Sequence, residues 1–254
     1  MKNIDKTLQY HELLMTRNLS RLGSFDLPKA FRFVFWDNDK CIDDWVRIHI
    51  ETGEFNCLEE AYQIFHEFYD RFYKEISKRC VFIENSLGEK IATATISPTT
   101  ERGYNCVVDW FAISPKAQGQ KLSKLLLFKA LNTAKELGYK KILLHTQTHT
   151  WLAAKIYLDC GFVPVDSGDK KGWEILKTIT NHPKLSSFNT LDKSELYDNQ
   201  ALKIKKELDK RHKNYNFSIW YINNRNDVYV RENQDYYKYK FTNNGGTIKL
   251  IKAE

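Results

Sequence analysis

The residues with the clearest chemical potential form one stretch, Val107–Ser123, with the sequence VVDWFAISPKAQGQKLS. It begins with alternating apolar residues typical of a strand, is interrupted at Ser114 and Pro115, and runs past Gly119 into an amphipathic helix. The first backbone N–H groups of a helix have no acceptor inside the helix, and the helix dipole favours negative charge there. A glycine lets the backbone approach a bulky ligand because it has no Cβ. The stretch therefore predicts an anion-binding site at a strand–loop–helix junction.

A second stretch continues the pattern. The helix that begins after Gly119 is expected to end at Gly138, because glycine suits the left-handed conformation at a helix C-terminus. KKILLHTQ then predicts a buried strand, and THTWLAAKIYLDCGFVP predicts a short helix that ends at Gly161. Taken alone, the first stretch has a second interpretation, which is a helix N-terminus without a ligand.

Together the two stretches resemble the cofactor-binding motifs of the GNAT superfamily of acetyl-CoA-dependent N-acetyltransferases. That family carries V-x-P-x-x-[QR]-G-x-G-x-[GA] between its fourth strand and its third helix. The matching residues here are Ile113, Pro115, Gln118 and Gly119. Lys121 stands where the family usually has glycine, and Ser123 stands where it has glycine or alanine. The Lys121 side chain either crowds the phosphates of the cofactor or adds a cation beside them.

The second motif of the family is roughly N-x-x-A-x-x-x-Y-x-x-x-G-F-x-P. The residues in register with it are Ala153, Tyr157, Gly161, Phe162 and Pro164, and Thr150 replaces the asparagine. The two motifs follow in the family's order, at a separation that fits one helix, one strand and one more helix. The resemblance covers roughly Phe31–Thr178 and implies the GNAT fold, an α/β (α+β) fold with a mixed, largely antiparallel sheet flanked by helices.

The resemblance implies an acetyl-CoA site with two parts. The main chain around Phe111–Ile113 would pair with the pantetheine arm like an extra strand, and one of its N–H groups would polarise the thioester carbonyl. The loop Gln118–Ser123 would hold the pyrophosphate through main-chain N–H groups. The predicted cofactor-binding residues are Phe111, Ala112, Ile113, Gln118, Gly119, Gln120, Lys121, Leu122, Ser123, Thr150 and Ala153.

Two residues are the catalytic candidates. Tyr157 matches the tyrosine that protonates the departing thiolate in many members of the family. A phenol has a pKa of about 10 and a thiol of about 8.5, so the phenol can donate a proton at neutral pH. The alternative is that Tyr157 only packs or orients the cofactor.

Asp109 precedes Phe111 and Ile113 by two and four residues on the same predicted strand, so the three share one face. It can accept a proton from the amine through water, attract the cationic amine, or serve the structure alone. His145 and His149 flank the end of the next strand, and His149 is the second candidate base. The seven histidines are not at ligand spacing with carboxylates, so we expect no metal site.

Composition sets outer limits. The chain has 254 residues, a hydrophobic content of 42% and a net charge of +7. Its five cysteines are scattered and outside metal-ligand spacing, which indicates reduced thiols of a cytoplasmic protein. The N-terminus is charged throughout, unlike a signal peptide, and no stretch is apolar enough to span a bilayer, so we expect no membrane partner. A basic surface suits the anionic cofactor and would also suit nucleic acid.

The predicted elements divide the chain into three parts. Residues 1–30 form an N-terminal extension, irregular or with one short helix, and residues 31–180 form the GNAT domain. Within that domain we expect a first strand at Phe31–Trp36, a helix at Ile42–Thr52, a second helix capped by Asn56 and Glu59, and a last strand at Trp173–Thr178. Residues 181–254 form an α+β appendage, with a helix at Lys193–Lys213 and then a four-stranded meander.

The sequence thus predicts an N-acetyltransferase that moves an acetyl group from acetyl-CoA to a primary amine by direct attack in a ternary complex. The predicted acceptor is a small molecule. The alternatives are a protein lysine or N-terminal acetyltransferase and a catalytically silent acyl-CoA-binding module. Nucleic acid is an unlikely partner because the basic, aromatic strands of the appendage are better explained as strands with one solvated face. The oligomeric state stays open between monomer and homodimer.

Overall fold

The structure is a computed structural model of the chain. It describes residues 4–23, 25–55, 57–165, 169–211, 220–222, 227–232, 235–244 and 247–252. The chain divides into two compact units. The first comprises Leu14–His145 and Asp159–Val165, and the second comprises Lys2–Leu13, Thr146–Leu158 and Asp166–Glu254. The predicted domain boundaries near residues 30 and 180 stay a prediction.

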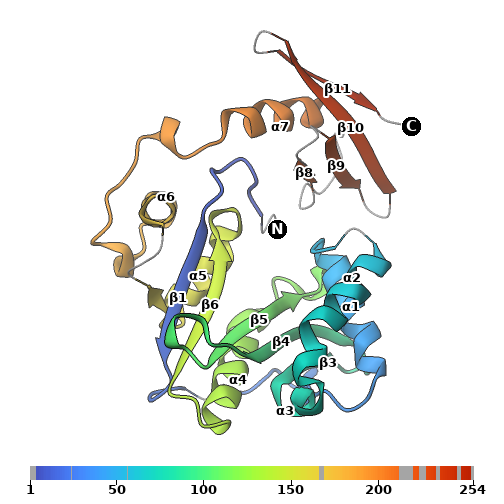
Figure 1. Ribbon diagram of the computed structural model, residues 1–254, viewed down its shortest axis with the longest axis vertical. Coiled ribbons are helices and arrows are strands. Elements are labelled where there is room, and N and C mark those ends of the chain that lie inside the picture. Colours follow the sequence, from blue (N-terminus) through green and yellow to red (C-terminus); the bar gives the residue numbers. More distant parts are fainter. Residues whose placement is uncertain are drawn as a thin grey trace. The chain divides into compact units, whose positions relative to one another are not determined.

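A mixed seven-stranded sheet, flanked by helices, forms the core of the first unit (Figure 1). Its strand order is β2-β3-β4-β5-β6-β1-β7. The strands are β1 (Glu12–Asn18), β2 (Phe31–Phe35), β3 (Cys80–Asn85), β4 (Lys90–Pro98), β5 (Cys106–Ile113), β6 (Lys141–Gln147) and β7 (Val163–Pro164). The ladders β2–β3, β3–β4, β4–β5 and β1–β7 are antiparallel, and β5–β6 is parallel. This arrangement confirms the predicted GNAT fold.

Helices α1 (Lys40–Thr52) and α2 (Leu58–Tyr69) pack on the sheet through an aromatic core. Trp45 from α1 and Phe65 and Tyr69 from α2 are fully buried against Cys80 and Phe82 of β3. Helix α4 (Leu122–Glu136) packs against β3, β4 and β5. The aromatic residues that recur along α2 are therefore chiefly core, as the spacing of three and four residues indicated.

The predicted second helix differs from the observed one at both ends. Cys57 is the N-cap of α2 and makes no side-chain cap, and Asn56, the predicted cap, lies outside the described residues. The helix ends at Tyr69 and continues as a 3₁₀ turn, Asp70–Glu75, before the short helix α3 (Ile76–Arg79). Phe72 has φ −140°, which is not helical. This break divides the apolar residues that recur at steps of three and four in the sequence into two separate segments.

The N-terminal segment forms a central strand, contrary to the expectation of irregular structure or a short helix. β1 lies between β6 and β7 in the sheet. Leu13, Leu14 and Met15 are buried in succession, as happens in a strand covered on both faces. Such a short apolar run does not alternate, so it lacks the period-two pattern that identifies a half-exposed strand.

The predicted last strand, Trp173–Thr178, is wrong. These residues belong to helix α6 (Lys170–Thr180). The side chain of Asp169 accepts hydrogen bonds from the backbone N–H groups of Lys171 and Gly172 and thereby caps the helix. The sheet instead ends with β7, a two-residue strand that pairs with β1.

The second unit contains helices α5 (Trp151–Asp159), α6 and α7 (Asn199–Arg211) and a four-stranded sheet of order β11-β10-β9-β8. Its strands are β8 (Trp220–Ile222), β9 (Asp227–Glu232), β10 (Asp235–Asn244) and β11 (Thr247–Lys252). α7 packs on this sheet: Ala201, Ile204 and Leu208 meet Val228 and Phe241. The predicted order of a helix followed by a meander is confirmed, but the helix begins at Asn199 and not at Lys193. Lys193–Glu195 form a separate 3₁₀ turn, and the predicted end at Lys213 lies outside the described residues.

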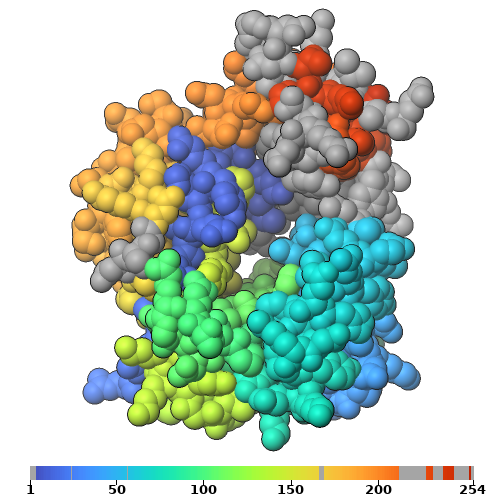
Figure 2. Space-filling model, in the orientation of Figure 1, coloured from blue at the N-terminus to red at the C-terminus, as the bar shows by residue number. Residues whose placement is uncertain are grey.

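The start of the chain pairs with the segment that precedes α7. The N–H of Gln9 donates to the Leu196 carbonyl at 2.9 Å, and the N–H of Asp198 donates to the Thr7 carbonyl at 2.8 Å. In Figure 2 the dark blue N-terminal residues lie beside the orange residues of this segment.

None of the described helices has the length and apolar character needed to cross a membrane.

Candidate active site

β5 and β6 separate part-way along their length. Their parallel ladder consists of the pairs Val107–Leu143 and Val108–Leu144. Beyond these pairs β5 continues to bond with β4, through Ala112 and Ile113. Within the described strands, the β6-facing edge of β5 therefore extends past the end of its ladder. An extended edge of this kind can accept a further strand-like ligand.

A β-bulge lies in the same part of β5. Thr95 of β4 pairs with Asp109 and Thr93 pairs with Ala112, so β5 has one residue more than β4 between these pairs. Within the bulge, Trp110 has φ 50°, a left-handed conformation that is rare for a residue with a large side chain. A bulge bends the strand and redirects its side chains. Here it brings the indole of Trp110 into the aromatic core of α1 and α2.

The predicted phosphate loop turns sharply between β5 and α4. Pro115–Ala117 form a 3₁₀ turn, Gly119 has φ 82°, and α4 begins at Leu122. Lys121, which replaces the usual glycine, is the N-cap of α4 and has φ 62°. A left-handed conformation costs an L-residue about 1–2 kcal/mol. Lys121 thus has a backbone conformation that glycine adopts without this cost, and its side chain makes no cap hydrogen bond to the first N–H groups of α4.

The loop is anchored at its start and open at its centre. The hydroxyl of Ser114, which is buried, donates to the Glu51 carboxylate at 2.5 Å, and Gln118 Nε2 donates to the Ile113 carbonyl at 3.1 Å. A Cβ placed on Gly119 would meet no atom within 4 Å. Gln120 and Lys121 are exposed, Ser123 is half-buried and Leu122 is buried in the core. The N-terminal turn of α4 is thus accessible to an anion.

Asp109 lies beside the bulge, at the point where β5 and β6 separate. Burial raises the pKa of its carboxyl group. The Ser97 hydroxyl and the nearby His145 and Arg71 side chains lower this pKa, and Glu101 raises it further. His145 is the next residue after the last pair of the parallel ladder, so it lies opposite Asp109 in register. Its Nε2 is 2.7 Å from Glu101 Oε2.

One wall near Asp109 is aromatic. The Trp110 ring is 5.1 Å from the Trp45 ring, 5.3 Å from His49 and 5.5 Å from Phe68, all between centroids. Burial lowers the pKa of His49 to about 3, so this imidazole is neutral at physiological pH. The aromatic rings packed around Trp110 therefore add no charge near Asp109.

The remaining predicted residues lie in the second unit. Tyr157 on α5 is buried, with 6% of its surface exposed, and Ala153 is half-buried on the same helix. The Thr150 hydroxyl contacts the Thr146 hydroxyl at 3.0 Å and donates to the Gln147 carbonyl at 3.1 Å, and with Gln147 it forms a capping box. Thr150 thus has a structural role, and a contact with the cofactor stays a prediction.

His149, the second candidate base, is held in the structure of the second unit. Its Nε2 is 2.9 Å from the Leu8 carbonyl, and its ring packs edge-on against Tyr10 with centroids 5.1 Å apart. Burial lowers the pKa of His149. These contacts favour a packing role, whereas His145 faces Asp109.

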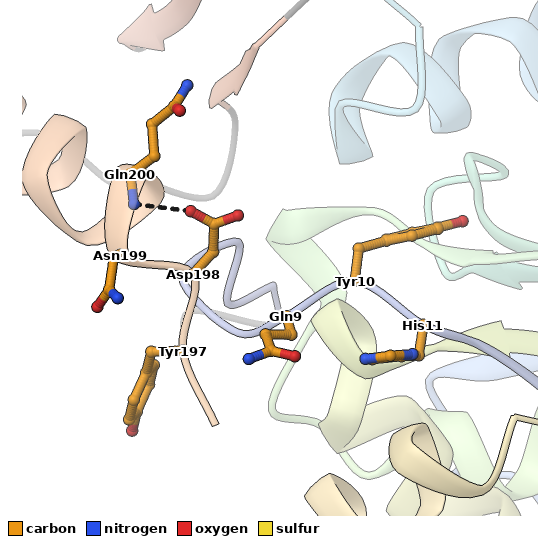
Figure 3. A pocket seen from close by; sticks show the side chains of 7 residues that line it. All are labelled: Gln9, Tyr10, His11, Tyr197, Asp198, Asn199 and Gln200. Carbon is orange, nitrogen blue, oxygen red and sulfur yellow. Dashed lines mark hydrogen bonds between the residues drawn. The ribbon is translucent and has the colours of Figure 1, made fainter. Parts of the chain in front are cut away.

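A separate open pocket of about 570 Å³ lies in the second unit (Figure 3). The residues that line it are Gln9, Tyr10, His11, Tyr197, Asp198, Asn199 and Gln200. Asp198 Oδ1 accepts from the N–H groups of Gln200 and Ala201, both at 2.8 Å, so it already caps the start of α7. This helix N-terminus has a carboxylate in the place that an anionic ligand would take, in contrast to that of α4.

Comparison with known proteins identifies the family of residues 42–162. Residues 42–162 match the model of the Acetyltransferase (GNAT) family. The chain contains a GNAT acetyltransferase domain. Among curated proteins, none matches this sequence. The GNAT match includes every predicted catalytic and cofactor-binding residue, and acyl transfer from acetyl-CoA is the reaction of this family.

One solved structure supports the fold, and a second is reported beside it. The chain is similar to a GCN5-related N-acetyltransferase from Sphaerobacter thermophilus, with a TM-score of 0.51, 10% identity and coverage of 63% of this chain and 49% of that one. It is also similar to a GNAT-family acetyltransferase from Colwellia psychrerythraea, with a TM-score of 0.49, 13% identity and coverage of 63% and 56%. The matched region spans about half of each of these chains. At such identities the likeness shows the fold alone.

Sequence reasoning missed three groups that face Asp109. Ser97, Glu101 and Arg71 come from β4, from the turn after β4 and from the turn after α2, and no motif marks them. Their positions depend on the pairing of β4 with β5 and on the break at the end of α2. Among the described residues, no group of three or more His, Cys, Asp or Glu side chains is placed to hold a metal ion.

Proposed function

We propose that this protein transfers the acetyl group of acetyl-CoA to the primary amine of a small molecule, by direct attack in a ternary complex. The observation that carries the proposal is the open edge of β5 beside an uncapped helix N-terminus, with Asp109 at the junction. Phe111–Ile113 would pair with the pantetheine arm. Gln118–Ser123 would bind the pyrophosphate, and Thr150 and Ala153 would contact the cofactor from the second motif.

The proton steps are assigned to two residues. An alkylammonium ion has a pKa of about 10, so it must lose a proton before it can attack the thioester. Asp109 accepts that proton through water, and its raised pKa makes it a better base than an ordinary exposed carboxylate. Tyr157 donates a proton to the departing CoA thiolate. The nitrogen loses two protons in all, one before it attacks the thioester and one as the tetrahedral intermediate collapses to the amide. One proton is given to the thiolate, and the other leaves to solvent by way of Asp109 and water.

The backbone of Lys121 favours catalysis over silent binding of the cofactor. The main support for a silent module was a side chain in place of the loop glycine. Lys121 takes a left-handed conformation that glycine adopts readily, which supports a loop path compatible with the cofactor. Its exposed ammonium group would add a positive charge near the phosphates. We also propose a cytoplasmic location, in keeping with five cysteines that are all free thiols.

The test is a combined binding and turnover experiment with the full chain. CoA binding is measured by calorimetry, and thiol release from acetyl-CoA is followed over a panel of amines, with the acetylated product identified by mass spectrometry. We expect CoA binding and at least one small amine that releases thiol in proportion to product. Absence of CoA binding by the folded protein overturns the proposal. Turnover restricted to peptides would instead favour a protein acetyltransferase.

A further inference from the structure

Arg71 is a cation near Asp109 that has no carboxylate partner within the part of the chain that the structure describes. It is exposed on the turn Asp70–Glu75, directly after α2. The two acidic residues of the same turn have other partners: Asp70 Oδ1 is 3.2 Å from His66 Nδ1, and Glu75 pairs with Arg79. Among the described residues, no carboxylate oxygen lies within 4.0 Å of the Arg71 guanidinium.

Two aromatic rings hold the guanidinium in place. Its central carbon lies 4.8 Å from the centre of the Phe68 ring and 5.6 Å from that of Phe72. Contact with ring faces orients a planar guanidinium and reduces the freedom that it would lose on binding a ligand. Arg71 is therefore a preorganised cation on an aromatic surface.

The same rings connect Arg71 to the reaction site. The Phe68 ring packs edge-on against Trp110, the neighbour of Asp109. On the other side, Phe72 packs against Tyr69, whose hydroxyl contacts the Thr95 hydroxyl at 2.7 Å, and Thr95 is the strand partner of Asp109. The charges of Arg71 and Asp109 interact, but the two groups do not close into an ion pair within 4.0 Å.

A positive charge at this place is unfavourable for a simple amine. An ammonium ion that approaches Asp109 is attracted by the carboxylate and repelled by Arg71, and both interactions are strong near a protein surface. An acceptor that also carries a negative group removes this conflict. A guanidinium presents a fork of N–H donors that fits a carboxylate, so a carboxylate is the anion that Arg71 suits best.

We propose that the acceptor is an amino acid-type zwitterion, whose ammonium group is bound at Asp109 and whose carboxylate is bound by Arg71. This inference rests on the proposed acetyl transfer and specifies its substrate class. Phe68 contacts both Arg71 and Trp110, the neighbour of Asp109, and these two rings would form the surface against which the body of the acceptor packs. The acceptor is recognised through both charged ends, and amines without a carboxylate are poor substrates.

Matched acceptors test the idea. Thiol release is measured for phenylalanine against phenethylamine, for lysine against cadaverine, and for the other standard amino acids. We expect kcat/KM to be about ten- to a hundredfold higher for the best carboxylated acceptor than for its decarboxylated counterpart, the usual range for a charge-assisted hydrogen bond. The inference is overturned if no carboxylated amine supports thiol release. It is also overturned if both members of each pair react equally well. Failure to bind CoA would instead overturn the proposed function.

Variants of Arg71 assign the preference to this residue. Arg71→Gln should remove the preference, chiefly through a higher KM for carboxylated acceptors, and leave the decarboxylated counterparts unchanged or faster because the repulsion is gone. Arg71→Lys keeps the charge without the fork, so it should restore part of the preference. Lys74→Gln, at an exposed position of the same turn, removes the same charge and should leave the preference intact. If Arg71→Gln lowers kcat/KM equally for both members of each pair, Arg71 acts only through the pKa of Asp109. That result would overturn the inference.

Discussion

At Asp109 the stability of the folded chain and the proposed role as a base make opposite demands. A carboxylate that must take up a proton is more effective where burial disfavours its charge, and burial raises the pKa of Asp109. The same burial makes the ionised form a cost to the folded state. Its pKa in the unfolded chain is near the ordinary value of 3.8. Between that value and the raised pKa the folded state binds more protons, so the free energy of unfolding decreases as pH rises through this window.

Asp109→Asn is therefore expected to stabilise the protein while it impairs the reaction. The amide carries no charge, so the variant should have a higher free energy of unfolding than the native chain at pH 7, and this advantage should shrink as pH falls through the window. KM for a cationic acceptor should rise, and kcat should fall by about 10²–10⁴-fold if Asp109 also takes the proton. Urea unfolding at pH 4 and pH 7, with steady-state kinetics, measures both. A variant less stable than the native chain at pH 7 contradicts the expected sign.

Tyr157→Phe separates proton donation from packing. The substitution keeps the buried ring on α5 and removes the hydroxyl group. If Tyr157 protonates the thiolate, kcat should fall by about 10²–10⁴-fold while CoA affinity is maintained. Calorimetry with CoA and thiol release under conditions where chemistry limits the rate give the two quantities. Near-normal kcat with the true acceptor would leave Tyr157 a packing residue.

At the scale of elements, local patterns were predictable and distant partnerships were not. The junction of β5, the loop and α4 is encoded within residues 107–123 by an alternating strand, Pro115 and Gly119. The family motif then supplied the roles of these residues. The helical core of α1 and α2 followed from its apolar spacing in the same way.

β1 and α6 were missed because their states depend on the rest of the chain. β1 is a strand because residues 12–18 fill the position between β6 and β7, which are more than a hundred residues away. α6 has β-branched and aromatic residues that suit a strand, and the cap from Asp169 decides for the helix. Arg71 was missed for a related reason, since its place near Asp109 requires the helix break at Tyr69.

In the proposed cofactor loop, the charge of Lys121 and its left-handed backbone can be tested separately. Lys121→Gly relieves a left-handed conformation worth about 1–2 kcal/mol but gives the unfolded chain more freedom, so we expect a net gain of about 0.5–1 kcal/mol in stability. It should also weaken CoA binding and reduce the salt dependence of that binding, because one cation beside the phosphates is lost. Lys121→Gln removes the charge and keeps the strained backbone. If both variants bind CoA as tightly as the native chain, the Lys121 side chain points away from the cofactor.

At the scale of the whole molecule, the C-terminal region has two distinct parts. One part is a hydrophobic cluster around Leu8 and Ile175. Its other members are Trp151, Ile179, Leu191, Leu196 and Tyr197. α7 and the meander have a core of their own, formed by residues such as Ile204, Leu208 and Val228. The segment before α7 is therefore part of the packing around the N-terminal residues, although it follows the predicted boundary near residue 180.

Two shortened chains distinguish these parts. A chain that ends at Asp198 removes α7 and the meander together, so the core formed by Leu8 and Ile175 stays covered. A chain that ends at His182 also removes Leu191, Leu196 and Tyr197. Leu8 and Ile175 are now 2% and 0% exposed, and exposure of a fully buried apolar side chain costs about 1.5–3 kcal/mol. We therefore expect the His182 chain to be less stable than the Asp198 chain by about 3–6 kcal/mol and to aggregate on mild heating.

CoA binding gives the functional outcome of the same comparison. Every predicted cofactor contact precedes residue 165, so the Asp198 chain should bind CoA as tightly as the full chain. Thermal unfolding and calorimetry on the purified chains measure stability and affinity side by side. Loss of CoA affinity in a folded Asp198 chain would show that α7 or the meander contributes to the cofactor site. Equal stability of the two shortened chains would show that residues 183–198 add nothing to the packing around Leu8, and would move the boundary of the catalytic body back to His182.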